Sequence, residues 1–283
     1  MSDLLRDFSA GYVGYSLVMG LRYTVFAGLA WLLFWVWQRG RDRWRHRRLA
    51  RREPPPDQLS AQVRREIRYS ILTVLIFGAV GALILVARQH GYTRLYFDVG
   101  EYGWPYLLFS TAAAILLHDT WFYWTHRLMH HPRLYHRVHR VHHLSHDPTP
   151  WAAFAFHPLE AIVEAGIFPL LVFTLPLHPL AIFGFMTWMM FFNVMGHLGH
   201  ELYPAGFLRT RLGRLNNTTT HHHLHHQLVR ANYGLYFNWW DRLMGTNHAR
   251  YVATFEEVTR REPDRVGEKQ LASVGPAEAH PIG

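Results

Sequence analysis

Cysteine is absent from the 283 residues of this sequence. Its absence excludes disulfides, iron–sulfur clusters bound by cysteine and haem with a thiolate ligand. Among the side chains that bind transition metals well, histidine remains as the obvious ligand. We also expect no cleavable signal peptide, because the first apolar stretch is too long and lacks a basic start.

Acidic residues are scarce as well, because 20 Asp and Glu stand against 29 Lys and Arg and leave a formal net charge of +9. The positive charge is concentrated, whereas a nucleic-acid-binding face would spread it among stacking aromatics. One block directly follows an apolar segment and contains Arg39, Arg41, Arg43, Arg45, Arg47, Arg48, Arg51 and Arg52. This position predicts a membrane-flanking loop attracted to anionic headgroups, and no nucleic-acid partner.

Four apolar segments predict an all-α, integral membrane helical bundle. Residues 11–37 are apolar apart from Arg22, and residues 70–87 carry no charge over nearly the ~20 residues that a spanning helix needs. A third segment covers residues 102–117. The fourth, 161–196, is broken at Pro176 and Pro179, which predicts a helical hairpin. We therefore expect a multi-pass protein with about four to five apolar helices.

The arginine block also predicts the orientation, because short basic loops stay in the cytoplasm. If residues 38–68 lie inside, successive crossings return residues 118–146 to the same side. The hairpin at 161–196 then leaves and comes back, so that residues 197–226 lie inside too. All the histidine clusters of the sequence would therefore meet in a histidine-rich helical cap at the cytoplasmic mouth of the bundle.

Histidine is the outlier of the composition, with 22 residues. Many of these lie three or four positions apart, so on helices their imidazoles would share a face. The candidate ligands are His126 and His130; His139, His142 and His143; His197 and His200; and His222, His225 and His226. Ten imidazoles exceed the four ligands of one tetrahedral zinc. Their number indicates two metal ions with open positions, although imidazole suits iron, copper, nickel and zinc alike.

Other polar residues have open roles at this point. We interpret the isolated histidines as core or interfacial residues; they are His46, His90, His136, His146, His178, His248 and His280. Asp119 and Glu160 could hold imidazole N–H groups or form surface ion pairs, and the first role is favoured slightly. His157 could be a ligand, a hydrogen-bond partner of a ligand, or a helix cap. A metal-ion transporter is the alternative function, but its ligands would line a path near the bilayer midplane.

Several motifs of this sequence resemble those of the fatty acid hydroxylase and sterol desaturase superfamily. They are HDTWFYWTHRLMHH, YHRVHRVHH, FHPLEA, HHHLHH and NYGLYFNWWDRLMGT, and they cover roughly residues 100–248. The pattern is nearest to sterol C4-methyl oxidases and C5 sterol desaturases. The family motif carries over as metal ligands onto His126, His130, His139, His142, His143, His197, His222, His225 and His226. His118 and His200 depart from the family pattern and are second-rank ligand candidates.

The resemblance implies a membrane-bound di-iron oxygenase that uses dioxygen and two electrons to hydroxylate or desaturate a lipid. The substrate would be sterol-like, a carotenoid or fatty acyl, in a pocket open to the bilayer with aromatics available to line it: Trp104, Phe109, Trp188, Phe191 and Phe192. No electron-carrier motif occurs in the chain. A separate electron-transfer protein is therefore expected, either cytochrome b5-like or a ferredoxin with its reductase.

Three regions follow from these expectations. Residues 1–100 form an N-terminal membrane anchor with the basic cytoplasmic loop, and residues 101–248 form a histidine-box catalytic domain. Residues 249–283, which contain proline and glycine, form a solvated and partly disordered tail.

Overall fold

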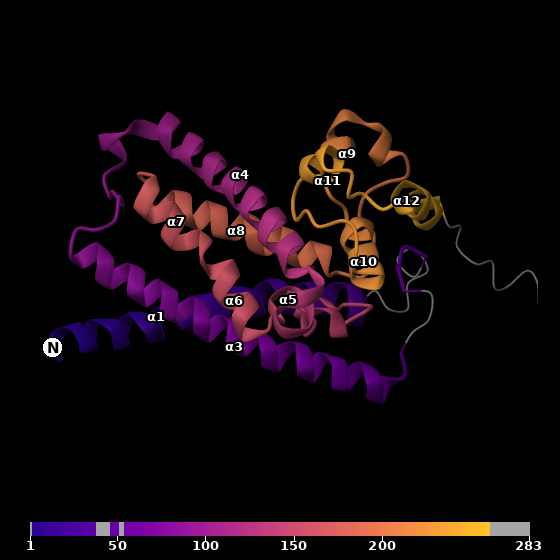
Figure 1. The fold of residues 1–283 in the computed structure, drawn as a ribbon, viewed down its shortest axis with the longest axis horizontal. Coiled ribbons are helices and arrows are strands. Elements are labelled where there is room, and N and C mark those ends of the chain that lie inside the picture. Colours follow the sequence, from indigo (N-terminus) through magenta and orange to yellow (C-terminus); the bar gives the residue numbers. More distant parts are fainter. Residues whose placement is uncertain (1, 38–45, 51–53, 261–283) are drawn as a thin grey trace, which may run out of the picture.

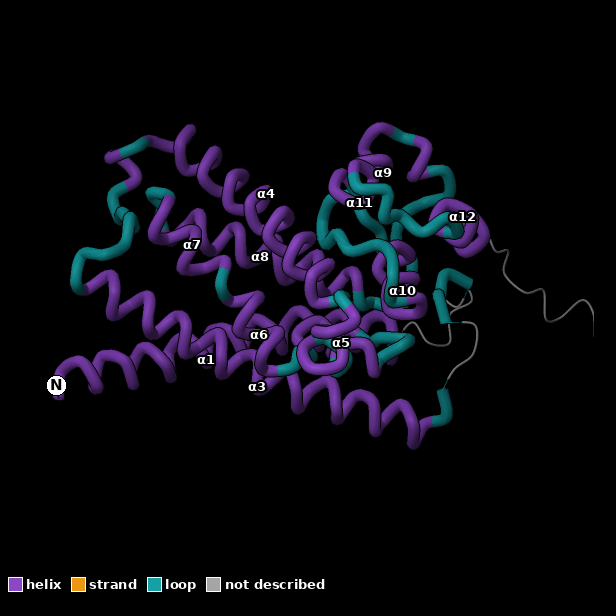
Figure 2. The backbone as a smooth tube through the Cα atoms, in the orientation of Figure 1, coloured by secondary structure: helices purple, strands orange, loops and turns teal. Residues whose placement is uncertain are grey.

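The computed structural model describes residues 2–37, 46–50 and 54–260, and within these ranges the chain is helical with no β-strand (Figures 1 and 2). Four long helices run along the long axis of the molecule: α1 (Ser2–Ala30), α3 (Pro56–Gln89), α4 (Gly103–Met129) and α8 (Pro179–Gly196). A π-helical segment, Trp31–Trp37, continues α1. The arginines at 39, 41, 43, 45, 51 and 52 lie outside the described residues.

Short helices connect and cover the long ones. Between α4 and α8 lie α5 (Pro132–Val138), α6 (Pro158–Ala165) and α7 (Ile167–Thr174). After α8 come α9 (Arg211–Leu215), α10 (Thr219–Leu228), α11 (Trp239–Leu243) and α12 (Tyr251–Arg260), which gather at the end of the molecule opposite the N-terminus (Figure 1). Single 3-10 turns form at Val99–Glu101, His142–Leu144, Pro150–Phe154 and Phe207–Arg209.

Three of the described helices are long and apolar enough to cross a membrane: Leu4–Trp37, which joins α1 to its π-helical end, α3 and α8. Their outer faces expose large apolar side chains such as Leu17, Leu21 and Leu83. A contiguous apolar surface of this kind is unfavourable in water and suits lipid contact. The expected break lies between α7 and α8, near Pro176 and Pro179, but α7 has only eight residues, so a hairpin that crosses the membrane twice and a count of four to five spanning helices stay predictions.

Small residues allow α1 and α3 to pack closely. Gly78 of α3 faces Ser16, and Gly81 faces the ring of Tyr15, so that any Cβ at these two glycines would collide with α1. The α1–α3 pair then packs on the hairpin and on α4, where Phe154 and Phe185 are fully buried. The N-terminal region is therefore part of the same hydrophobic core as the histidine-rich region.

The same dipeptide starts three of the helices. His131–Pro132, His157–Pro158 and His178–Pro179 stand at the starts of α5, α6 and α8, where each histidine accepts a hydrogen bond from the backbone N–H two residues later. Proline is favoured in the first helical turn because its missing N–H would have no partner there. These three histidines therefore serve as helix caps, which decides among the three roles left open for His157.

The expectation of a solvated tail from residue 249 is wrong for its first part. Residues 251–260 form α12, whose Tyr251, Phe255 and Val258 are buried against α10 and the 3-10 turn at residues 207–209. An amphipathic spacing of apolar side chains in YVATFEEVTR explains this packing. Residues 261–283 lie outside the described residues.

Candidate metal centre

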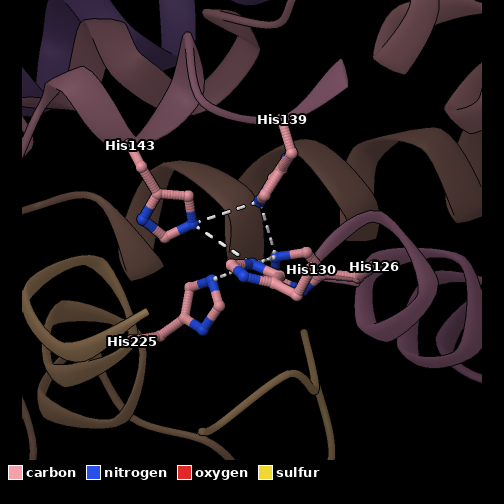
Figure 3. Close-up of side chains that lie close together, drawn as sticks. All are labelled: His126, His130, His139, His143 and His225. Atoms are coloured by element: carbon pink, nitrogen blue, oxygen red, sulfur yellow. Dashed lines mark hydrogen bonds between the residues drawn. The ribbon is translucent and has the colours of Figure 1, made fainter. Parts of the chain in front are cut away.

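Nine of the ten candidate histidines converge into two groups at the end of the bundle that carries α10. The five-histidine group consists of His126, His130, His139, His143 and His225 (Figure 3). The four-histidine group consists of His142, His197, His222 and His226. Within each group the ligand nitrogens lie within 4.8 Å of one another. Seven of the nine are buried below 4% exposure, so the convergence is internal to the fold.

Helix ends supply most of these side chains. His126 lies in the last turn of α4, and His130 caps its C-terminus. His197 caps the C-terminus of α8. The three histidines of α10 point from one helix into both groups, because His225 joins the first and His222 and His226 join the second. The i, i+3, i+4 spacing of HHLHH is therefore helical, as expected from the sequence.

The second histidine box does not form the single helix that its spacing predicted. His139 is the C-cap of α5, and His142 and His143 lie in a separate 3-10 turn. The turn directs the neighbouring side chains apart, so that His142 enters the four-histidine group and His143 the five-histidine group. Here the tertiary contacts of the imidazoles stabilise the chain more than an extension of the seven-residue helix α5 would.

His200 belongs to neither group. Gly199 has a φ of +75°, which turns the chain away from the axis of α8 and removes His200 from the face of His197. Its imidazole packs instead against Trp35, at 6.0 Å between ring centroids, and against Phe34 at 5.9 Å. His118 lies apart too, because its Nδ1 bonds to the hydroxyl of Tyr236 at 2.7 Å.

Backbone carbonyls fix the tautomer of four histidines. Nδ1 of His126 donates to the carbonyl of Tyr233 at 2.8 Å, and Nδ1 of His225 to that of Ala231 at 2.7 Å. In the other group the carbonyls of Asn193 and Ser145 accept from His197 (2.7 Å) and His226 (2.9 Å). A carbonyl can only accept, so Nδ1 must carry the proton and Nε2 must present its lone pair to the centre of the group.

These lone pairs face one another at short range. The Nε2 atoms of His197 and His226 are 3.2 Å apart although both are acceptors, and similar Nε2···Nε2 contacts of 3.0–3.3 Å link the five-histidine group. Burial and the neighbouring imidazoles lower the pKa of His142, His222 and His225, and burial lowers that of His143 to about 3. Neutral imidazoles with facing lone pairs repel one another unless a cation lies between them. The residues present therefore fit a metal ion in each group.

A carboxylate supports the fifth tautomer. Oε1 of Glu160, in α6, lies 2.7 Å from Nδ1 of His139, and both side chains are buried. This is the role favoured for Glu160 from the sequence. Asp119 has a different role, because it accepts from the backbone N–H groups of Tyr236 and Phe237 and from the indole of Trp239. It holds the segment before α11 and contacts none of the nine histidines.

Asp241 organises the turn that supports His126. Its two carboxylate oxygens accept from the N–H groups of Tyr233 (2.9 Å) and Gly234 (2.7 Å), and from the hydroxyl of Thr246 (2.7 Å). The same Tyr233 supplies the carbonyl for His126. The turn held by Asp241 therefore orients His126 through its backbone, a contact that no residue type in the sequence reveals.

Glu66 provides a comparable link from the membrane helices and was not singled out from the sequence. It lies in α3, fully buried, and accepts from the hydroxyls of Ser145, at 2.7 Å, and Thr149. Ser145 in turn supplies the carbonyl for His226. Glu66 stands in the charged first part of α3, beside Arg64, Arg65 and Arg68, so the sequence offered no signal that its side chain is buried.

Two apolar cavities lead from the lipid-facing helices toward the histidines. The outer cavity has a volume of about 120 Å³ and is lined from α1, α3, α4, α7 and α8 by residues that include Met19, Phe77 and Phe185. The smaller inner cavity shares Phe77 and adds Phe122 and Phe156. The ring centroid of Phe122 lies 4.8 Å from that of His126, and the ring centroid of Phe156 lies 5.3 Å from that of His142. None of the five aromatics named above as available to line a pocket is part of either lining, in agreement with a packing role for them.

Comparison with known proteins supports the assignment of this centre. Residues 111–246 match the sequence model of the fatty acid hydroxylase family. The chain is 33% identical over 199 residues to a Delta(7)-sterol 5(6)-desaturase of Gibberella zeae (70% of this chain, 60% of the relative). It is 32% identical over 193 residues to the lathosterol oxidase of Rattus norvegicus (68% and 63%). A Delta(7)-sterol 5(6)-desaturase of Aspergillus fumigatus is 33% identical over 219 residues (70% and 67%).

The chain thus spans about 60% of the length of the first two relatives. No solved structure is significantly similar to it. Both histidine groups and the apolar helix α8 lie inside the matched residues 111–246. This chain is an integral membrane protein and belongs to the fatty acid hydroxylase and sterol desaturase superfamily.

Proposed function

We propose that this protein is a membrane-bound di-iron oxygenase that uses dioxygen and two electrons to hydroxylate or desaturate a lipid. The observation that carries the proposal is the pair of buried, all-histidine groups whose Nε2 lone pairs converge. The relatives support it, because they are named as sterol 5(6)-desaturases and lathosterol oxidases. A sterol-like lipid is therefore the first substrate class to test, ahead of carotenoids and fatty acyl chains.

Bound iron would supply the oxidising power for an unactivated C–H bond. The protein has three tasks around it. The nine histidines hold the ions, and the Nδ1–H groups of five of them are fixed by Glu160 and by backbone carbonyls. The phenylalanines of the inner cavity exclude water and hold the lipid against the metal side of the pocket. The outer cavity lets the rest of the lipid extend toward the bilayer.

Electrons must come from outside the chain in this proposal, from a cytochrome b5-like protein or a ferredoxin with its reductase. The two histidine groups lie at the end of the bundle that carries α10 (Figure 1). The transporter alternative has no support, because the ligands are buried at this one end and do not line a path along the helices.

We predict two metal ions per chain. Elemental analysis of the full chain, prepared anaerobically from iron-supplied cells, measures this number directly. Lipid analysis of cells with and without the active protein completes the test, because hydroxylation adds one oxygen and desaturation removes two hydrogens. One ion or none in folded protein, or an unchanged lipid mass profile, would reject the proposed function.

Replacing Glu160 by glutamine should weaken metal binding without unfolding the chain. The amide keeps the shape of the side chain but removes the charge that supports Nδ1–H of His139. Loss of such a partner typically lowers metal affinity or activity by about 10–100-fold. Metal retention during stepwise chelation measures the effect, and Glu257→Gln on the exposed face of α12 is the control. Equal retention by both variants would show that Glu160 does not support the ligand.

We also predict that the histidine groups face the cytoplasm. The chain has no native cysteine, so a single cysteine placed at Asp147 can be labelled without background. Asp147 is partly exposed and lies close to the four-histidine group through His223. A membrane-impermeant maleimide should react with it only after the cells are opened. Labelling of intact cells would reverse the predicted topology.

A further inference from the structure

The inner cavity contains one acidic side chain, and one of its two carboxyl oxygens has no partner among the described residues. Glu164 is the only charged residue between positions 161 and 196 and lies in the last turn of α6. Its side chain is 5% exposed and lines the inner cavity together with Phe122 and Phe156. Among the described residues, its Oε1 has no hydrogen-bond partner. A buried polar atom without a partner is unfavourable and seldom kept without a reason.

The other polar groups of this cavity are already engaged. His118 bonds through Nδ1 to the hydroxyl of Tyr236 at 2.7 Å, and the amide of Asn193 donates to the carbonyl of Ala153 at 2.8 Å. Of these three groups, Glu164 is the one with a buried atom, Oε1, that has no partner. The surroundings are otherwise apolar, so an incoming polar atom would find this carboxyl as its partner.

The position of Glu164 restricts what the partner can be. Phe122 and Phe156, which share the cavity with it, each touch a metal-binding histidine of a different group. A lipid atom bound at Glu164 would therefore be separated by only a few carbon atoms from the lipid carbon that reaches the metal centre. An acyl chain has only C–H groups near its reacting carbon, and its polar end stays at the membrane surface. It would leave the carboxyl unpaired.

We propose that Glu164 binds a hydroxyl group of the lipid substrate, so that hydroxylated, sterol-like lipids enter hydroxyl end first and leave their apolar part in the outer cavity. This inference rests on the proposed function and names its substrate class. A hydroxyl both donates and accepts, so it can pair with the carboxyl in either protonation state. The outer cavity, with its almost wholly apolar lining from five helices, suits the remaining hydrocarbon.

Binding of two matched lipids to the full-length protein in phosphatidylcholine nanodiscs tests the proposal. Lathosterol and cholest-7-ene differ only in the 3-hydroxyl, and each competes with tritiated lathosterol for retention by the protein. We expect the wild type to bind lathosterol at least tenfold more tightly than cholest-7-ene. Glu164→Leu should reduce this ratio to less than threefold, and Glu164→Met, which keeps more of the length of the side chain, should do the same.

Glu101→Leu is the matched control, because Glu101 is exposed in the 3-10 turn before α4. It should keep the wild-type ratio, and equal metal content in all variants shows that they are folded. A wild-type ratio near one, no saturable retention of lathosterol, or an unchanged ratio in both Glu164 variants would overturn the inference. The assay needs neither dioxygen nor electrons, so it separates this inference from the proposed function: binding without lipid oxidation would reject only the latter.

Discussion

Replacing His142 by alanine is expected to abolish lipid oxidation while leaving a folded, membrane-inserted protein. His142 is one of four ligands in its group, and its Nε2 lies 3.2 Å from that of His197. Its loss opens the group and should cost more than the roughly 10–100-fold that follows loss of a ligand's hydrogen-bond partner. The helices are held by apolar burial and backbone hydrogen bonds, which do not depend on the metal. Product formation per folded protein and the metal content per chain measure the two effects.

The matched control is His136→Ala. His136 lies six residues earlier in the same histidine-rich segment, on α5, and its side chain is exposed. It should keep wild-type turnover and two metal ions per chain. If His142→Ala and His136→Ala were equally active at equal metal content, His142 would not belong to the site. The assignment of the histidine boxes as metal ligands would then lose its main support.

Replacing Asp241 by alanine is expected to destabilise the protein by about 3 kcal/mol or more. The carboxylate is fully buried and accepts from Tyr233, Gly234 and Thr246, and its removal leaves the backbone N–H groups of Tyr233 and Gly234 without a partner. Each buried donor left unpaired costs about 1–3 kcal/mol. Because Tyr233 also orients His126, the five-histidine group should lose metal as the turn loosens. Denaturant titration in detergent gives the change in free energy of unfolding.

Glu257→Ala on α12 provides the comparison for Asp241, because Glu257 is an exposed acid in the same C-terminal region. Surface substitutions of this kind usually change stability by no more than about 0.5 kcal/mol. A loss of similar size in both variants would mean that Asp241 does not hold the turn. Retention of full metal content in a strongly destabilised Asp241→Ala would separate the stability of the turn from the orientation of His126.

The histidine spacing predicted the members of the centre well, because helical periodicity depends only on local geometry. It could not predict which of the two groups each histidine joins. His142 and His143 are neighbours in the sequence, yet a 3-10 turn sends them to different groups. His200 shares the spacing but not the site, because Gly199 turns the chain with a positive φ.

The hydrogen bonds that orient the imidazoles of the two groups were harder to predict from the sequence. Three of the groups that fix the tautomers are the carbonyls of Tyr233, Ala231 and Ser145, and a carbonyl is present at every position of every protein. Only the fold decides which of them meets an imidazole. Glu160 could be identified because its side chain supplies the contact. Helix α12 was missed because proline and glycine in residues 261–283 dominated the composition of the whole tail.

The origin of the residues that line the outer cavity affects how lipid preference can change between related proteins. The match to the fatty acid hydroxylase family begins at residue 111, whereas Tyr15, Met19, Phe77 and Gly81 of the outer cavity lie before it. In the proposed function these side chains meet the hydrocarbon of the substrate but never the metal. Exchanging α1 and α3 between relatives should therefore transfer lipid selectivity as a module while the oxidising machinery stays the same. The part of the chain that first looked like a plain membrane anchor would then be where new substrates are acquired.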